Sequence, residues 1–227
     1  MSSLVQATNA RYEFSANDQS LTGGFISIVV GSVESEATFI VHERLICETS
    51  EFVKRAMGGE WKESRQRLIR LPDQSPRVFH IYVQWLYLHV LPTRDDSEHS
   101  YGEYDQLARA YILGDILLDT SFRDAVIDAM LDKALTLNPG QSTIELIYEN
   151  TVASCAARRL LVDLYTERAR GIWLKTWAPD SPARDFFYDL AVALLDKRQK
   201  TERKEWNPCD YHDHGLDENP RCQSRLP

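Results

Sequence analysis

The sequence has few cysteines and no long apolar run. Its 227 residues include four cysteines, which is too few for a disulfide scaffold in a chain of this length. No apolar run approaches the roughly 20 residues of a membrane-spanning helix. The first residues lack the basic and apolar regions of a secretory signal. We therefore expect a protein of the cytosol or nucleus that has no membrane partner.

Basic residues are outnumbered, and the motifs of common enzyme classes are missing. The chain has 26 Lys and Arg against 34 Asp and Glu, a formal net charge of -8, so it lacks the cationic excess typical of nucleic-acid-binding proteins. It contains no G-x-x-x-x-G-K-[ST], G-x-G-x-x-G or G-x-S-x-G motif. Gly23–Gly24 precedes a predicted strand, whereas phosphate-binding loops follow one. We expect no nucleic-acid partner and no enzymatic activity.

What the sequence does contain is a pattern of short strands and longer helices. Hydrophobic residues make up 43% of the chain, enough to bury a core. Phe25–Gly31 and Ala37–His42 are short β-rich segments joined by a polar connection, which predicts an antiparallel hairpin. Arg67–Leu71 is a third strand. The prediction is an α+β fold in which a small three-stranded sheet is flanked by helices.

Helix signals separate and follow these strands. Ser50 is a predicted N-cap of a short helix, and Gly58–Gly59 end it by tolerating the left-handed conformation. Asp119 caps a later helix. Ser75–Pro76 open a helix whose apolar side chains recur with the spacing of a buried face: Val78, Ile81, Tyr82, Trp85 and Leu86.

Asn138–Pro139–Gly140 is the clearest break in the chain. Beyond it the periodicity predicts an all-helical C-terminal half. Ser142 and Glu145 have the spacing of a capping box at the first helix of this half. The last helix has an apolar face that we expect to be buried: Phe186, Phe187, Leu190, Ala191, Leu194 and Leu195.

Several of these residues resemble a known family. Val41–Phe52 resembles the BTB/POZ signature, in which a strand ends in His, an aliphatic residue follows three later, and Ser-x-Phe comes after. Ala56–Ser64 resembles its fungal continuation, and Leu71–Asp73 and Trp85–Tyr87 resemble later landmarks. The resemblance implies a non-enzymatic protein-interaction module with a helical C-terminal extension. It divides the chain into a flexible arm at 1–21, a BTB/POZ-like domain at 22–135, a helical extension at 136–200 and a polar Cys/His-containing tail at 201–227.

The signature residues also have a physical interpretation. His42, where a strand meets a helix, is interpreted as a structural group that bonds backbone atoms, against a catalytic or metal-binding role. Ser50 is interpreted as a cap because no histidine lies in an activating sequence context. Dimerising family members carry a charge pair at two positions that align with Phe25 and Glu43. Because this chain lacks the pair, we do not expect a homodimer of that kind.

An alternative function within the same family is that of substrate adaptor for a cullin-based ubiquitin ligase. Family adaptors carry a hydrophobic-x-Glu element before the third strand, and Trp61–Lys62–Glu63 matches that spacing. Trp61 would fill an apolar groove of the cullin while Glu63 fixes the register. The other interpretation is that Trp61 packs on its own domain.

The tail carries a candidate metal site. Cys209, His212, His214 and Cys222 are close in sequence, and two cysteines with two histidines are a common ligand set for structural zinc. Zinc would also stabilise a segment too polar to form its own core, giving a zinc-stabilised scaffold as a further alternative. The other interpretations are a solvated tail with incidental histidines, or a Cys209–Cys222 disulfide that forms on oxidation.

The zinc hypothesis predicts the metal content of the purified protein. Protein never exposed to a chelator should contain about one equivalent of zinc, because four such ligands complete a tetrahedral site. Cys209→Ser should remove most of it, whereas the control Cys155→Ser, outside the cluster, should not. Elemental analysis checks this. Less than about a tenth of an equivalent in the unaltered protein would exclude the site.

Overall fold

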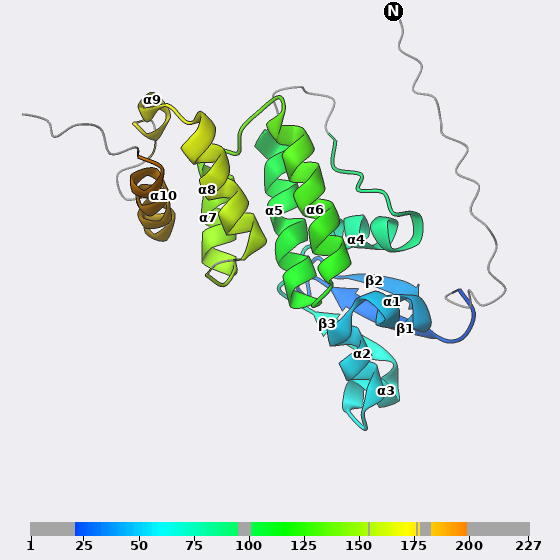
Figure 1. Cartoon of the computed structure of the whole chain (residues 1–227). Helices are drawn as coiled ribbons and strands as arrows, with labels where there is room; N and C mark the ends of the chain where they lie inside the picture. Colours follow the sequence, from blue (N-terminus) through cyan, green and yellow to red (C-terminus); the bar gives the residue numbers. More distant parts are fainter. Residues whose placement is uncertain (1–20, 95–100, 154, 176, 178–182, 199–227) are drawn as a thin grey trace, which may run out of the picture.

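A small sheet lies at one end of the molecule, and pairs of helices lead away from it (Figure 1). This computed structural model describes residues 21–94, 101–153, 155–175, 177 and 183–198. Within these residues the protein is α+β, with a three-stranded mixed sheet near the N-terminus followed by a mostly helical region.

The sheet has the strand order β2-β1-β3. Strand β1 (Phe25–Val30) pairs antiparallel with β2 (Ala37–His42), which confirms the predicted hairpin. Strand β3 (Leu68–Leu71) lies parallel to β1 on its other side. It begins one residue later than predicted, because Arg67 has a positive φ of 53° and ends the preceding helix.

Three short helices connect β2 to β3: α1 (Glu43–Thr49), α2 (Glu51–Gly58) and α3 (Lys62–Gln66). Helix α3 was not predicted. Helix α2 ends where expected, but the expected left-handed conformation is wrong, since Gly59 is extended with φ −110°. The reason for a glycine here is space, because a Cβ at Gly59 would overlap the Trp61 indole.

Helices α4 (Pro76–Leu88), α5 (Tyr101–Ile116) and α6 (Thr120–Ala134) follow the sheet. All five residues of the predicted α4 stripe are buried, and Trp85 is only 5% exposed. The Trp85 ring lies 5.1 Å from the ring of Phe122 in α6 and 6.1 Å from that of Tyr82. Helix α4 thus joins the sheet to the α5–α6 pair.

The C-terminal half consists of α7 (Gln141–Asn150), α8 (Ala156–Arg168), α9 (Gly171–Leu174) and α10 (Arg184–Lys197). No strand follows β3 within the described ranges. The predicted capping box is wrong. The Ser142 hydroxyl donates to Asp105 Oδ1 at 3.0 Å, while Glu145 Oε1 accepts from Gln141 Nε2 at 2.7 Å.

The predicted inner face of α10 is right only for its first half. Phe186 and Leu190 are buried, but Ala191, Leu194 and Leu195 are exposed. The described core reaches this helix only as far as Ala193, so the later apolar side chains have nothing in the described structure to pack against.

One hydrophobic core runs from Ile26 in β1 to Leu190 in α10 and crosses the connection at residues 137–140. The division into a domain at 22–135 and an extension at 136–200 therefore stays a prediction. Among the helices described, none is both long and apolar enough to cross a membrane.

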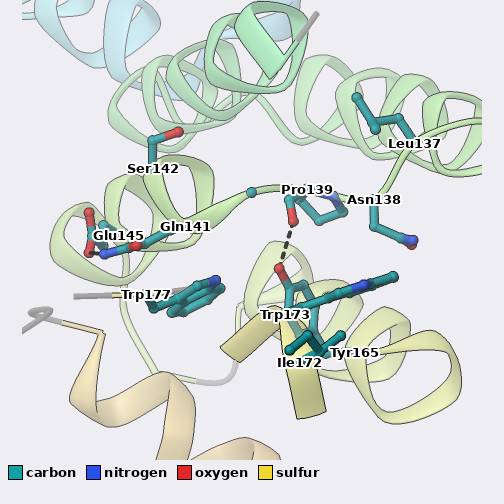
Figure 2. A pocket seen from close by; sticks show the side chains of 11 residues that line it. Leu137, Asn138, Pro139, Gln141, Ser142, Glu145, Tyr165, Ile172, Trp173 and Trp177 are labelled. Atoms are coloured by element: carbon teal, nitrogen blue, oxygen red, sulfur yellow. Dashed lines mark hydrogen bonds between the residues drawn. The ribbon is translucent and has the colours of Figure 1, made fainter. Parts of the chain in front are cut away.

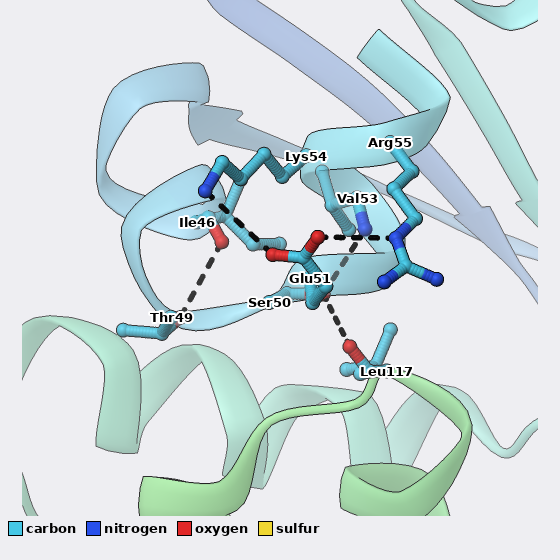
Figure 3. Close-up of polar contacts among 8 residues, drawn as sticks. All are labelled: Ile46, Thr49, Ser50, Glu51, Val53, Lys54, Arg55 and Leu117. Atoms are coloured by element: carbon cyan, nitrogen blue, oxygen red, sulfur yellow. Dashed lines mark hydrogen bonds and ion pairs between the residues drawn. The ribbon is translucent and has the colours of Figure 1, made fainter. Parts of the chain in front are cut away.

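Buried hydrogen bonds join the start of α2, one of the helices that connect β2 to β3, to the turn between α5 and α6 (Figure 3). The Ser50 hydroxyl accepts from the Val53 amide at 3.2 Å, as the predicted N-cap should, and donates to the Leu117 carbonyl at 2.6 Å. The Phe52 amide donates to the same carbonyl at 3.3 Å. One serine therefore starts α2 and also fixes α2 against the α5–α6 turn.

A second set of buried hydrogen bonds lies at the same turn. Asp119 is the predicted N-cap of α6, and its Oδ1 accepts from the Phe122 amide at 2.9 Å. Its Oδ2 accepts from the Tyr82 hydroxyl of α4 at 3.0 Å. Because both carboxylate oxygens are bonded, Asp119 can be fully buried without a cationic partner.

The burial of Trp85 predicts the cost of its removal. Trp85→Ala should lower the free energy of unfolding by about 3–5 kcal/mol, because it leaves a large cavity in the core. Trp61→Ala, which truncates a tryptophan that is 67% exposed, is the matched control and should cost less than about 1 kcal/mol. Denaturant melts measure both values. A loss below about 1 kcal/mol for Trp85→Ala would contradict the packing described here.

Two serines at helix N-caps provide a second stability test. Ser50→Ala should cost roughly 2 kcal/mol, because it removes the cap of α2 and a buried bond to Leu117. Ser75 occupies the N-cap position of α4, but its exposed side chain makes no capping bond. Ser75→Ala should therefore cost less than about 0.5 kcal/mol. Equal losses in the two melts would contradict the role given to Ser50.

Candidate functional site

The predicted partner-binding residues, Trp61 and Glu63, lie at the start of α3. Trp61 is the N-cap residue of that helix and Glu63 is in its first turn. Trp61 is 67% exposed, and Glu63 is also exposed. The indole lies over Gly59 of its own domain and still leaves most of its surface open to solvent, so both interpretations of Trp61 stay predictions.

A shallow hollow of about 280 Å³ includes Glu63 and lies between α2, α3 and β3. Strand β3 is at the edge of the sheet, so the hollow borders a strand edge that pairs with no other described strand. Its apolar lining residues are buried or half-buried, and its charged lining residues are exposed. We call it the α3 hollow; its lining residues are Phe52, Ala56, Lys62, Glu63, Gln66, Leu68, Ile69 and Arg70.

A larger groove of about 770 Å³ lies in the C-terminal half, and the sequence did not predict it. Figure 2 shows the connection between α6 and α7 along one side, with Trp177 near Gln141 and Glu145 and with Trp173 near Tyr165. We call it the aromatic groove. Its lining residues are Leu137, Asn138, Pro139, Gly140, Gln141, Ser142, Glu145, Tyr165, Ile172, Trp173 and Trp177.

Tyr165 organises the aromatic rings of this groove. Its hydroxyl donates to the Pro139 carbonyl at 2.7 Å, which fixes the connection to α8. The Tyr165 ring meets Trp173 at 6.3 Å and 81° and Trp177 at 5.9 Å and 69°, both edge-to-face. Trp177 also stacks on Phe186 of α10 at 5.8 Å and 24°, so one of its faces is covered by the core.

The polar groups of the aromatic groove include both hydrogen-bond donors and acceptors. The Oδ1 atom of Asn138 is buried and has no hydrogen-bond partner among the described residues. Glu145 lines the groove. Asp105 of α5 lies beside the start of α7, where its carboxylate accepts from the Thr143 hydroxyl at 2.7 Å. Among the lining residues that the structure describes, there is no lysine, arginine or histidine.

The sequence held only faint signals of this groove. Asn138–Pro139–Gly140 was noted as a chain break, and Trp173 and Trp177 lie four residues apart in a segment with no clear helical period. Nothing in the sequence indicates that Tyr165 of α8 packs against these two tryptophans. That arrangement depends on how α8, α9 and the connection pack.

Burial raises the pKa of one thiol and of several phenols in the described structure. Burial, followed by the nearby Glu43 carboxylate, raises the pKa of the Cys47 thiol. Burial raises the pKa of Tyr82 well above its usual value, and the Asp119 carboxylate adds to this. Burial also raises the pKa of Tyr148, which donates to Asp189. A protonated thiol or phenol is a poor nucleophile, so these groups are suited to structural roles.

His42 has a structural environment, as interpreted from the sequence. Its backbone amide donates to the Tyr87 hydroxyl at 3.0 Å, and its Nδ1 lies 2.8 Å from the same oxygen. The expectation that the imidazole bonds backbone groups is wrong, because a tyrosine from α4 takes that place. His42 therefore ties the end of β2 to α4.

The two positions aligned with the family's dimer charge pair have local partners. Phe25 is half-exposed, and its ring lies 4.4 Å from that of His42. Glu43 forms an ion pair with Arg67 of the same chain. The expectation about self-association is not tested by these contacts and stays a prediction.

The predicted zinc ligands, Cys209, His212, His214 and Cys222, lie outside the described residues. Within the ranges that are described, no three His, Cys, Asp or Glu side chains come together in a way that could hold a metal ion. The zinc prediction therefore still depends on the metal analysis proposed above.

Sequence comparison with protein families and with curated proteins does not identify a relative of this chain. No protein-family model matches the chain, and no curated protein shows significant sequence similarity to it.

Proposed function

We propose that this chain is a non-enzymatic protein-interaction module of the BTB/POZ type. The observation that carries the proposal is the exposure of Trp61 beside Glu63 and the α3 hollow. Tryptophan has a large apolar surface, and it is among the residues most enriched where protein partners bind most strongly. A partner that covers Trp61 would remove that surface from water.

The arrangement around Trp61 supports a protein partner of ordinary interface chemistry. Phe52 and Ala56 supply apolar floor, while Lys62, Glu63 and Arg70 supply charges at the rim of the α3 hollow. Apolar centres with polar rims are typical of protein interfaces. The edge of β3 adds unpaired main-chain groups to which an extended segment of a partner could bond.

The BTB/POZ assignment is supported by the order of the elements and by the roles of the signature residues. A hairpin is followed by a helix pair and then by a third strand parallel to the first. His42 and Ser50, two fixed points of the signature, both make contacts that hold elements together. The proposal that the module is non-enzymatic is supported by the raised pKa of the half-buried Cys47 thiol, which makes it a poor nucleophile.

A second candidate function is that of substrate adaptor for a cullin-based ubiquitin ligase. The observation that favours it is that Trp61 and Glu63 have the family's hydrophobic-x-Glu spacing and are both exposed. A surface for the substrate would then lie in the helical half. The zinc-stabilised scaffold is the remaining alternative and depends on the tail.

The Trp61 surface is tested by affinity capture from cell extract with quantitative mass spectrometry. Trp61→Ala combined with Glu63→Ala should reduce cullin capture by more than about tenfold, because hot-spot residues carry most of an interface's binding energy. The melt should be unchanged, since both side chains are exposed. The structural basis of this test is the 67% exposure of Trp61.

A matched control uses the other half of the molecule. Tyr188→Ala combined with Asp185→Ala truncates an aromatic residue that is 71% exposed and an exposed carboxylate of α10. This double variant should capture a cullin as the unaltered chain does. Undiminished cullin capture by the Trp61/Glu63 variant would contradict an adaptor function that binds the cullin through these two residues. A partner lost equally from both variants would contradict binding through Trp61.

A further inference from the structure

The outer edge of β2 carries main-chain groups that point away from the sheet. In the strand order β2-β1-β3, β1 is the one described strand that pairs with β2. The Ser27 amide of β1 donates to the Arg67 carbonyl, toward β3, and the main-chain groups of successive strand residues point to opposite sides. The register of β1 with β2 therefore turns the N–H and C=O groups of Thr38, Ile40 and His42 outward.

One end of this edge is already closed. The His42 amide donates to the Tyr87 hydroxyl at 3.0 Å, which agrees with the outward direction of its main-chain groups. No contact among the described residues engages the main-chain N–H and C=O groups of Thr38 and Ile40. Both residues are exposed, and Ile40 is 68% exposed although it is apolar. These two residues are therefore able to bond to another strand.

Strand β2 lacks the features that usually protect an exposed strand edge. Monomeric proteins prevent edges from pairing with other chains by means of lysine, proline, bulges or very short strands. Strand β2 has six residues without lysine, proline or glycine, and its register with β1 is continuous. The opposite edge differs, because β3 has only four residues and carries an exposed Arg70. Of the two edges, that of β2 is the less protected against pairing.

The free part of β2 is complementary to a second copy of itself. In an antiparallel pair with two-fold symmetry about Phe39, Thr38 of each copy lies opposite Ile40 of the other. Outward-pointing residues that lie opposite each other exchange both of their main-chain hydrogen bonds. The pair therefore uses every outward N–H and C=O group of both residues. A register centred on Ile40 would instead need the His42 amide, which is already bonded to Tyr87.

The side chains of β2 suit the same register. Thr38 and Ile40 lie on one exposed face, because residues two apart share a face of a strand. Each Ile40 packs beside Thr38 of the other copy, and such cross-strand pairs of β-branched residues stabilise sheets. The two Phe39 residues meet at the centre, where side chains of opposite strands come closest. At the ends, Glu36 lies opposite His42, so the paired segments bring no like charges together.

We infer that two copies of this chain pair through the outer edges of β2 and join their sheets into one. The pairing does not depend on the proposed function, because the α3 hollow borders β3 at the opposite edge. It also needs no charge pair at the positions of Phe25 and Glu43. Each assembly presents two Trp61 surfaces, which strengthens binding to any partner that has two matching sites.

Sedimentation of the full chain, in the presence of a reductant, measures the pairing. The chain should be monomeric at about 20 µM and reversibly dimeric at about 1 mM, because a contact between two strands is smaller than a standard protein interface. A chain that remains monomeric at the higher concentration would overturn the inference. The Trp61→Ala, Glu63→Ala chain should dimerise as the unaltered chain does, so failure of either surface is seen separately.

Two variants separate the β2 edge from general effects of charge and hydrophobicity. Ile40→Lys places a cation on the paired edge and should weaken the dimer by about tenfold or more. Val33→Lys makes the same change at an apolar residue that is 91% exposed and lies outside β2, and it should leave the dimer unchanged. Both chains should melt as the unaltered chain does, since both side chains are exposed. Equal effects of the two variants on dimerisation would overturn the inference.

Amide hydrogen exchange at the same two concentrations identifies the strand that pairs. The Thr38 and Ile40 amides should exchange quickly in the dilute chain and slowly in the concentrated one. The Phe39 and Val41 amides, which face β1, should be protected at both concentrations. Protection of Thr38 and Ile40 in the dilute chain would overturn the inference, because the edge would then be covered within one copy. Dimerisation without protection of these two amides would also overturn it, because another surface would then join the copies.

Discussion

The buried turn between α5 and α6 is the constraint on which the rest of the structure depends. Ser50 and Asp119, one from each side, satisfy their polar atoms across this turn and in doing so start α2 and α6. Tyr82 adds a bond from α4. Because each of these groups is buried, any separation of the sheet unit from the helices would leave several of them unpaired at once. The sheet and the first helix pair therefore behave as one body.

The two candidate surfaces lie in different parts of the chain, and they differ in kind. Trp61 is an isolated exposed ring at the start of α3, suited to insertion into a partner. The aromatic groove is concave, with its rings held by Tyr165 and by the core residue Phe186.

The tight packing at the α5–α6 turn contrasts with the apolar surface that is exposed at the C-terminal end of α10. Leu194 and Leu195 of α10 remain exposed although their spacing predicts a buried face. An amphipathic pattern records only that a helix has an apolar side, and it does not say whether another element covers that side. The predicted buried face of α4 was fully confirmed, because the sheet, α5 and α6 cover the apolar side of that helix.

The sequence by itself determined the local elements: the hairpin from its β-branched segments, the caps at Ser50 and Asp119, and the α4 stripe that buries Trp85. These follow from short-range backbone and side-chain preferences, which a single segment carries in full. It did not determine that β3 runs parallel to β1, that Ser142 bonds Asp105 instead of capping α7, or that Tyr165 lies between two tryptophans. Those contacts join segments that are far apart in the chain or compete with a local bond, and only the tertiary packing decides which partner is within reach.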